Sequence, residues 1–167
     1  FPTRRSSDLD PLLDVRAVES PRQPTLVVVD SRLETPDGAR LWGPKRPVWI
    51  YGALAPDAAH TRLTRLGAEV RRLPNAAGKV DLAALIDDLG TRGINELHIE
   101  AGHKLNGSLL RAGLVDELLI YLAPKMLGSG RGMAQFGPLD RLDEALGFRW
   151  TSVDRVGNDL RLLARRA

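Results

Sequence analysis

Two uninterrupted runs of apolar residues constrain the fold of this chain more than any other feature. The first is TLVVVD at residues 25–30, and the second is VWIY at residues 48–51, which Gly52 closes. A strand with one face in water alternates apolar and polar residues, whereas a strand buried on both faces is apolar throughout. We therefore predict two central strands in a sheet that is covered on both faces, as parallel sheets are.

Helical patterns alternate with these strands along the chain. Residues 56–66 predict a helix, because Pro56 stands in its first turn and Gly67 follows its end. A second helix is predicted at 81–89, where Asp81 can act as the N-cap and four apolar side chains share one face. Further elements are predicted as a strand at 68–73, a strand that follows Gly93 and ends at Glu100, a helix that ends near Gly113, and a strand at 115–123.

The C-terminal part contains more strands than helices. Residues 148–156 and 159–164 are joined at Gly157-Asn158, and so short a connection predicts an antiparallel hairpin. The expected fold class is therefore α/β, with a mostly parallel central sheet, helices on both faces and a C-terminal antiparallel hairpin at one edge. Ligands of such sheets bind beyond the carboxyl ends of the strands.

Composition excludes several classes of protein. The chain has 167 residues, of which 43% are hydrophobic and 27% charged, which is typical of one soluble globular domain. No apolar run approaches the roughly 18 residues that a membrane helix needs. The absence of cysteine excludes disulfides and thiol nucleophiles, and three histidines without an H-x3-H pair predict no metal site. We expect a cytoplasmic protein.

The charge of the chain suggests a small anionic ligand more than a nucleic acid. The net charge is +3 and the isoelectric point is about 9.7, but 24 basic residues are interspersed with 21 acidic ones. No aromatic platform accompanies the basic residues, so we expect no nucleic-acid partner. A phosphorylated metabolite would suit this balance.

The stretch from Glu100 to Ser108, EAGHKLNGS, is the main candidate for a functional site. Its predicted strand–turn–helix order places a carboxylate at a strand tip and free backbone N–H groups at a helix start, where anions bind. Gly102 and Gly107 lack Cβ atoms, so a phosphate or a flat ring can approach the backbone. We interpret the stretch as the floor of a nucleotide site. An ordinary strand–helix turn is the alternative, because the glycine spacing matches neither G-x-G-x-x-G nor G-x4-G-K-[ST].

Individual side chains keep two interpretations each. Glu100 can bind ligand N–H or O–H groups and stabilise a developing positive charge, or it can pair with an arginine. Ser31 can serve a phosphate or cap a turn, and His103 can contact a ligand or lie exposed. His98 is expected to be structural. No G-x-S-x-G surrounds Ser108, so the pattern does not indicate a serine hydrolase, and no residue is identified as catalytic.

Four segments occur in an order and at separations that identify a family; they are residues 26–32, 94–102, 113–118 and 123–128. Together they closely resemble the reductase domain of the bifunctional riboflavin-biosynthesis deaminase/reductase, from Asp10 to about Ala164. The resemblance implies a dihydrofolate-reductase-like fold. It also implies NADPH-dependent reduction of 5-amino-6-(5-phosphoribosylamino)uracil to its ribitylamino form, by hydride transfer to C1′ of the opened ribose.

The resemblance also implies roles for individual residues and a homo-oligomeric assembly. The implied substrate-binding residues are Leu13, Arg16 and Glu100, with Arg16 facing the ribose phosphate. The implied cofactor-binding residues are Ser31, Gly102, His103, Lys104, Leu105, Asn106, Gly107 and Ser108. The loop at residues 10–16 is expected to bury its leucines and to turn Arg16 outward.

The first nine residues, FPTRRSSDL, resemble a translated sequencing adaptor, and we predict that they are a non-native segment. Residues 10–167 are then a reductase domain that lacks its first strands, and a zinc deaminase domain is expected upstream in the intact protein. Two rival functions remain open. One is a pterin or folate reductase of the same fold, and the other is a non-catalytic nucleotide-binding or dimerisation module.

Overall fold

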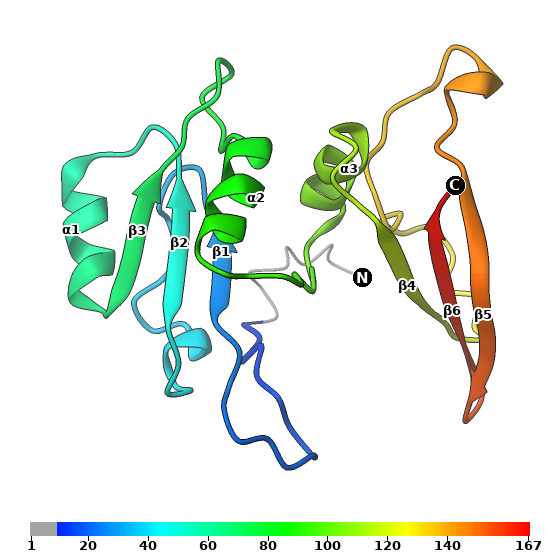
Figure 1. Cartoon of the computed structure of the whole chain (residues 1–167), viewed down its shortest axis with the longest axis horizontal. Helices are drawn as coiled ribbons and strands as arrows, with labels where there is room; N and C mark the ends of the chain where they lie inside the picture. The colour runs from blue at the N-terminus through cyan, green and yellow to red at the C-terminus, as the bar shows by residue number, and fades with distance from the viewer. Residues whose placement is uncertain (1–9) are drawn as a thin grey trace. The chain divides into compact units, whose positions relative to one another are not determined.

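The computed structural model describes residues 10–167, so the predicted non-native segment at residues 1–9 lies outside the described residues. The described chain divides into two compact units, residues 10–98 and Ile99–Ala167. We call them the N-terminal unit and the C-terminal unit, and Figure 1 labels their helices and strands. No helix among the described residues combines the length and the apolar character needed to cross a membrane.

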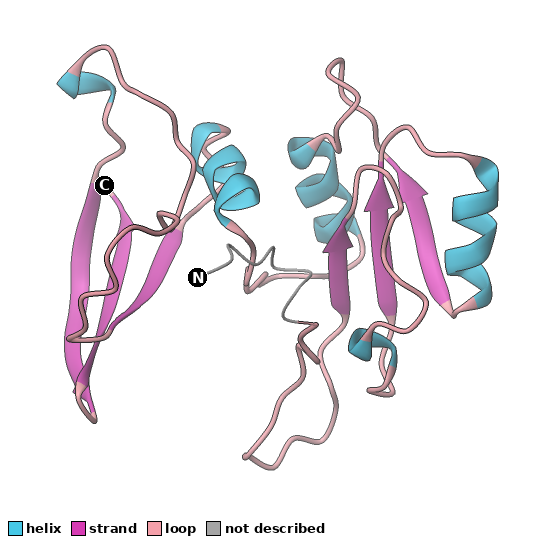
Figure 2. Ribbon diagram, turned by 180° about the vertical axis from the view of Figure 1, so that it is seen from behind, coloured by secondary structure: helices cyan, strands magenta, loops and turns pink. Residues whose placement is uncertain are grey.

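The N-terminal unit is built on a three-stranded parallel sheet. Its strands are β1 (Leu26–Val29), β2 (Val48–Gly52) and β3 (Ala68–Arg72), in the order β1-β2-β3. Both pairings are parallel, and the three strands point the same way in Figure 2. The two apolar runs of the sequence therefore form neighbouring parallel strands, as predicted.

One helix covers each face of this sheet. Ile50 of β2 belongs to the same buried cluster as Leu63 of α1 (Asp57–Arg65), whereas the next residue, Tyr51, belongs to a cluster with Leu85 of α2 (Leu82–Thr91). Successive strand residues point to opposite faces, so a strand between two helices must be apolar at every position. Each leucine buried in this way contributes roughly 1.5–3 kcal/mol.

Local signals in the sequence set the ends of both helices. The carboxylate of Asp81 accepts a hydrogen bond from the Ala84 N–H at 3.0 Å, which confirms the predicted N-cap of α2. Pro56 precedes α1, and Gly67, with a φ of +94°, follows its end in the left-handed region that glycine favours.

The predicted strand that ends at Glu100 is wrong. Residues 94–102 form no strand, and β1 pairs with β2 alone within residues 10–167. Ile94 and Leu97 nevertheless pack against the cluster under α2. The apolar alternation therefore identifies side chains that reach the core. A strand also needs inter-strand hydrogen bonds, and the pattern does not specify a partner that would make them.

The C-terminal unit contains α3 (His103–Arg111) and a three-stranded antiparallel sheet. Its strands are β4 (Glu117–Leu122), β5 (Phe148–Val156) and β6 (Asp159–Arg166), in the order β4-β6-β5. The β5–β6 hairpin turns at Gly157, which has a φ of +61°, and is confirmed. β4 pairs with β6 and not with the parallel sheet. Two short 3₁₀ helices that the sequence patterns did not indicate are η2 (Arg40–Trp42) and η3 (Leu142–Glu144).

Candidate functional site

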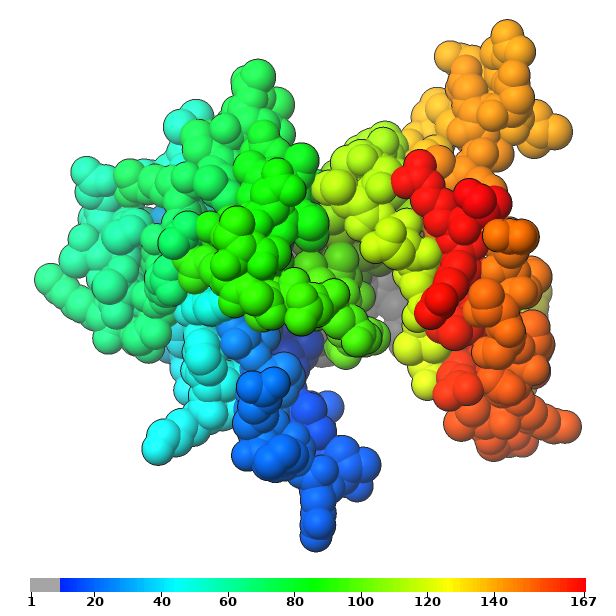
Figure 3. All heavy atoms as spheres, viewed as in Figure 1, coloured from blue at the N-terminus to red at the C-terminus, as the bar shows by residue number. Residues whose placement is uncertain are grey.

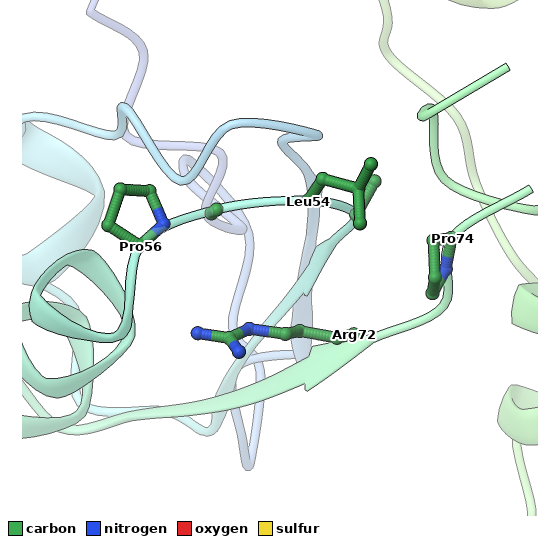
Figure 4. Close-up of a pocket in the computed structure, with 6 residues that line it drawn as sticks. Leu54, Pro56, Arg72 and Pro74 are labelled. Atoms are coloured by element: carbon green, nitrogen blue, oxygen red, sulfur yellow. The ribbon is translucent and has the colours of Figure 1, made fainter.

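An open cavity lies at the carboxyl ends of β2 and β3 in the N-terminal unit. Its volume is about 410 Å³, and its lining comes from the residues that follow β2 and from the end of β3: Ala53, Leu54, Ala55, Pro56, Arg72 and Pro74. The Arg72 side chain extends from β3 toward Pro56 at the start of α1 (Figure 4). Its Nη2 donates to the Asp57 carboxylate at 2.8 Å. This is the edge of a parallel sheet at which ligands bind.

Arg72 is a candidate that the sequence patterns missed. It ends a strand at the ligand-binding edge of the sheet and places a positive charge beside the cavity. Its position could have identified it: the alternation of apolar and polar residues predicts a strand there, and Arg72 lies at the carboxyl end of that strand. A cation at the carboxyl end of a parallel strand is well placed for an anionic ligand.

Ser31 lies directly after β1 at the same edge of the sheet. Its Oγ accepts a hydrogen bond from the Val80 N–H at 3.2 Å, and its carbonyl accepts one from the Ala53 N–H at 3.1 Å. The Ser31 hydroxyl therefore makes a structural contact with the backbone of a distant segment, and its contact with a phosphate stays a prediction. A serine hydroxyl that accepts in this way can still donate its own proton to another group.

The segment after Ser31 is held by hydrogen bonds from two directions. The Asp30 Oδ2 atom accepts from both the backbone N–H and the Oγ1 of Thr35, each at 2.7 Å. Arg62 of α1 donates to the carbonyls of Leu33 at 2.8 Å and Thr35 at 2.9 Å. These contacts fix the path of the chain as it leaves β1, and with it the position of Ser31.

The two substrate-side candidates of the N-terminal unit lie in the loop before β1. Leu13 is partly buried and packs against the cluster under α1, while the Arg16 side chain is 64% exposed and pairs with Asp14 at 3.3 Å. The predicted outward direction of Arg16 is confirmed, and both leucines of the loop, which were predicted to be buried, are partly buried. The tip of the loop, residues 17–22, is exposed and projects from the rest of the N-terminal unit (Figure 3).

In the C-terminal unit, α3 begins at His103, and Gly102 is its N-cap with no side-chain hydrogen bond. The predicted helix start is therefore confirmed. Glu100 and Lys104 are exposed, and Gly102 and His103 are partly buried. The first turn of the helix thus offers backbone N–H groups without a side-chain cap, together with a lysine side chain.

The second half of the predicted cofactor stretch makes contacts within the protein. Asn106 Nδ2 donates to the Met133 carbonyl at 2.9 Å, and a Cβ atom on Gly107 would lie 2.0 Å from the Gln135 carbonyl oxygen. Ser108 Oγ donates to the Lys104 carbonyl at 3.0 Å, inside the helix. Gly107 thus lets another part of the chain approach its backbone, and this part is residues 133–136.

Residues 133–136, which we call the docked segment, are bound to α3 at several points. The Gln135 N–H donates to the His103 carbonyl at 2.7 Å. Arg111 Nη1 donates to the carbonyls of Gln135 at 3.3 Å and Phe136 at 3.2 Å. Leu105, the remaining residue of the predicted stretch, is partly buried. A cofactor contact by any residue of this stretch stays a prediction.

A polar cluster that the sequence did not indicate joins α2 to the parallel sheet. The Tyr51 hydroxyl donates to Asp88 at 2.5 Å, and burial together with this hydrogen bond raises the pKa of Tyr51 above its ordinary value. Arg92 donates to both carboxylate oxygens of Glu69, at 3.0 and 2.5 Å, and lies 4.5 Å from the centre of the Trp49 ring. Because Tyr51 is buried and its hydroxyl is bound to Asp88, we assign the cluster a structural role.

Comparison with known proteins identifies the family. Residues 7–162 match the family model described as the RibD C-terminal domain. The chain is 35% identical over 145 residues to the riboflavin biosynthesis protein RibD of Escherichia coli. The matched residues make up 83% of this chain and 37% of that protein. It is 30% identical over 155 residues to the 2,5-diamino-6-ribosylamino-4(3H)-pyrimidinone 5′-phosphate reductase of Methanothermobacter thermautotrophicus, covering 90% of this chain and 71% of that protein.

A solved structure agrees with the sequence comparison. Acinetobacter baumannii RibD, form 1, matches with a TM-score of 0.79 at 25% identity, over 95% of this chain and 43% of that chain. The α/β class and the dihydrofolate-reductase-like fold expected from the sequence are thereby confirmed. The chain spans about two fifths of the length of the bacterial RibD proteins that it matches. It belongs to the RibD C-terminal domain family.

Proposed function

We propose that this chain is the reductase domain of a riboflavin-biosynthesis enzyme, which reduces 5-amino-6-(5-phosphoribosylamino)uracil to its ribitylamino product. The observation that carries the proposal is the match to the Methanothermobacter protein, which is named a reductase and of which this chain covers 71%. That name describes a phosphorylated ribosylamino-pyrimidine as the substrate, which belongs to the same chemical class. The net charge of +3 and the exposed Arg16 suit a phosphorylated substrate.

We further propose NADPH as the cofactor, which when bound supplies the hydride for the reduction. The residues at the sheet edge fit such a group, because the Ser31 hydroxyl can still donate and Arg72 places a guanidinium beside a cavity of about 410 Å³. In the C-terminal unit, the first turn of α3 with Gly102, His103 and Lys104 can bind phosphate oxygens.

On the substrate side, we assign three residues to binding and orientation. Arg16 pairs with the ribose phosphate, since a guanidinium can bind two phosphate oxygens at once. The Glu100 carboxylate accepts hydrogen bonds from amino or hydroxyl groups and stabilises positive charge at the carbon that is reduced. Leu13 contributes its backbone and the apolar wall of the loop. No residue of this chain is assigned as a proton donor.

The intact protein is proposed to be larger and to self-associate. The E. coli relative is more than twice as long as this chain, which covers 37% of it. We propose that a zinc deaminase domain precedes residues 10–167, that residues 1–9 are not native, and that the protein is a cytoplasmic homo-oligomer.

The proposed function is tested by adding NADPH and one of three substrates to the chain and following NADPH consumption. The substrates are 5-amino-6-(5-phosphoribosylamino)uracil, its 2,5-diamino-pyrimidinone counterpart and dihydrofolate. Consumption with the uracil compound, and formation of a product two hydrogens heavier by mass spectrometry, would support the proposal. Turnover of dihydrofolate alone would favour the pterin or folate reductase. NADPH binding without turnover of any substrate would favour a non-catalytic module. The intact protein with its upstream sequence serves as the positive control.

A further inference from the structure

Three non-glycine residues of the loop before β1 have left-handed backbone conformations. Their φ angles are +40° at Asp10, +52° at Leu13 and +60° at Ala17. Side chains with a Cβ atom disfavour this region, so such residues persist only where surrounding contacts hold them. Strained residues of this kind gather at sites where a particular side-chain direction is needed. The contacts that hold Leu13 therefore indicate which side chains of the loop need a fixed direction.

Arg46, which lies two residues before β2, holds Leu13 through two consecutive carbonyl groups. Its Nη1 donates to the Leu13 carbonyl, and its Nη2 donates to the Leu12 carbonyl. The first carbonyl belongs to the peptide plane after Leu13 and the second to the plane before it. Because φ and ψ describe the rotation between these two planes, the guanidinium fork fixes the conformation of Leu13.

Burial of Arg46 supports a dedicated role. Its Nε atom is buried and makes no hydrogen bond. Burial lowers the pKa of Arg46, and the nearby Asp14 carboxylate acts in the opposite direction. Removing a guanidinium from water is unfavourable unless its remaining hydrogen bonds compensate. The two hydrogen bonds to the carbonyls of Leu12 and Leu13 therefore explain why an arginine occupies this position.

A second side chain closes the other half of the loop. Gln23 accepts a hydrogen bond from the Val15 N–H at 2.8 Å and donates one to the Val15 carbonyl at 3.1 Å. Asp14 and Arg16, which pair at 3.3 Å, flank Val15 in the sequence. Asp14 thus lies between the backbone held by the Arg46 fork and the backbone held by the Gln23 amide. Arg16 follows directly after Val15 and is joined to Asp14 by the ion pair, so its direction depends on both anchors.

We propose that Arg46 is a positioning residue for the substrate phosphate, acting through the backbone of Leu12 and Leu13 to direct Arg16. The proposal rests on the proposed function, in which Arg16 binds the ribose phosphate. Arg46 itself contacts no substrate, since its fork is occupied by the two carbonyl groups. Its replacement acts on phosphate binding by releasing the loop.

The test compares Arg46→Ala with Arg16→Ala, using ribose 5-phosphate as the probe and ribose as its phosphate-free counterpart. We expect Arg46→Ala and Arg16→Ala each to weaken ribose 5-phosphate binding by about tenfold or more, the effect of losing one charge-assisted contact. Arg46→Ala should also increase hydrogen exchange at residues 12–16, whereas Arg16→Ala should not. NADPH affinity should stay within about twofold of the wild type in both variants, because the proposed cofactor contacts include neither Arg16 nor Arg46.

Two further variants keep the test decisive. Arg32→Ala removes the same charge from a 70% exposed side chain paired with Glu34, and it should leave binding and exchange unchanged. Arg46→Lys retains the charge but cannot donate to two carbonyls in a fixed fork, so it should show intermediate affinity and exchange. If Arg46→Ala does not fold, the comparison of Arg46→Lys with the wild type decides.

The outcomes separate this proposal from the proposed function. Wild-type affinity for ribose 5-phosphate in the Arg46 variants would overturn the positioning role while leaving the Arg16 contact intact. Unchanged exchange at residues 12–16 would also overturn it. If the wild-type protein binds ribose 5-phosphate no better than ribose, the Arg16 contact of the proposed function is wrong, and the positioning role is wrong with it.

Discussion

Replacing Gly107 with alanine should destabilise the C-terminal unit, although alanine is the better helix former. Gly107 lies inside α3, where a Cβ atom would meet the Gln135 carbonyl oxygen at 2.0 Å, its carbon at 2.5 Å and its nitrogen at 2.9 Å. All three are backbone atoms, so no side-chain rotation can relieve the contact. The docked segment at residues 133–136 has to move away from the helix.

The size of this effect follows from the contacts that the movement breaks. An ordinary contact of 3.4 Å requires the Gln135 oxygen to retreat by about 1.4 Å. The hydrogen bonds Gln135–His103, at 2.7 Å, and Asn106–Met133, at 2.9 Å, cannot survive such a shift. Each contributes about 1 kcal/mol, and inserting a methyl group into a packed site costs about 1–3 kcal/mol. The higher helix propensity of alanine offsets about 1 kcal/mol of this loss. We expect a net destabilisation of about 2–4 kcal/mol.

Gly90 provides a matched control, because it also lies inside a helix. A Cβ atom there meets nothing within 4 Å, so Gly90→Ala in α2 should stabilise the protein by about 0.5–1 kcal/mol. The two variants are compared by urea unfolding, with hydrogen exchange to locate the change at residues 133–136. Opposite signs of the two free-energy changes are expected. A stabilising Gly107→Ala without faster exchange at Gln135 would refute the reasoning.

Three further predictions concern the pH dependence of stability, one turn and the proposed site. Hydrogen bonds from Arg92 lower the pKa of Glu69 below its ordinary value of 4.5, so the stability that they provide is present above that pH and is lost as the pH falls through the lowered pKa. The wild type should therefore unfold at a higher urea concentration than Glu69→Gln at pH 7, and the gap should close in acid; a gap independent of pH would contradict this. Ser31→Ala removes the acceptor of the Val80 N–H at 3.2 Å, so it should destabilise the protein by about 1 kcal/mol and speed exchange at Val80, and unchanged exchange would argue against the cap. Glu100→Gln, in the intact protein, should lower kcat by at least about tenfold and leave the Kd for NADPH within about twofold; equal losses in both would count against a substrate-side role.

Much of the fold could be predicted because short-range sequence patterns specify it. The apolar runs at residues 25–30 and 48–51 contain the strands Leu26–Val29 and Val48–Gly52, and both faces of these strands are covered as their composition requires. The N-cap at Asp81 and the hairpin turn at Gly157 were predicted from the sequence in the same way. Each of these features depends on residues within a few positions of one another, so one stretch of sequence suffices to predict it.

Long-range pairing accounts for the parts of the structure that the patterns did not predict. The segment that ends at Glu100 has the alternation of a strand but pairs with no strand of residues 10–167, and β4 pairs with β6 instead of extending the parallel sheet. Periodicity reports which side chains face the core. It carries no information about which backbone will supply the hydrogen bonds.

The roles of individual residues in the candidate site divide in the same way. Local patterns were enough to predict a glycine at the start of the helix that is α3, and a loop with an outward Arg16 before β1. They also marked Gly107 as a point of close approach to the backbone, but did not identify what approaches it. The packing of the folded chain was needed to see that Gly107 accommodates the backbone of Gln135 and that the guanidinium of Arg46 holds the carbonyls of Leu12 and Leu13. These contacts join residues about 30 positions apart, and the chain brings them together only when the elements between them have packed.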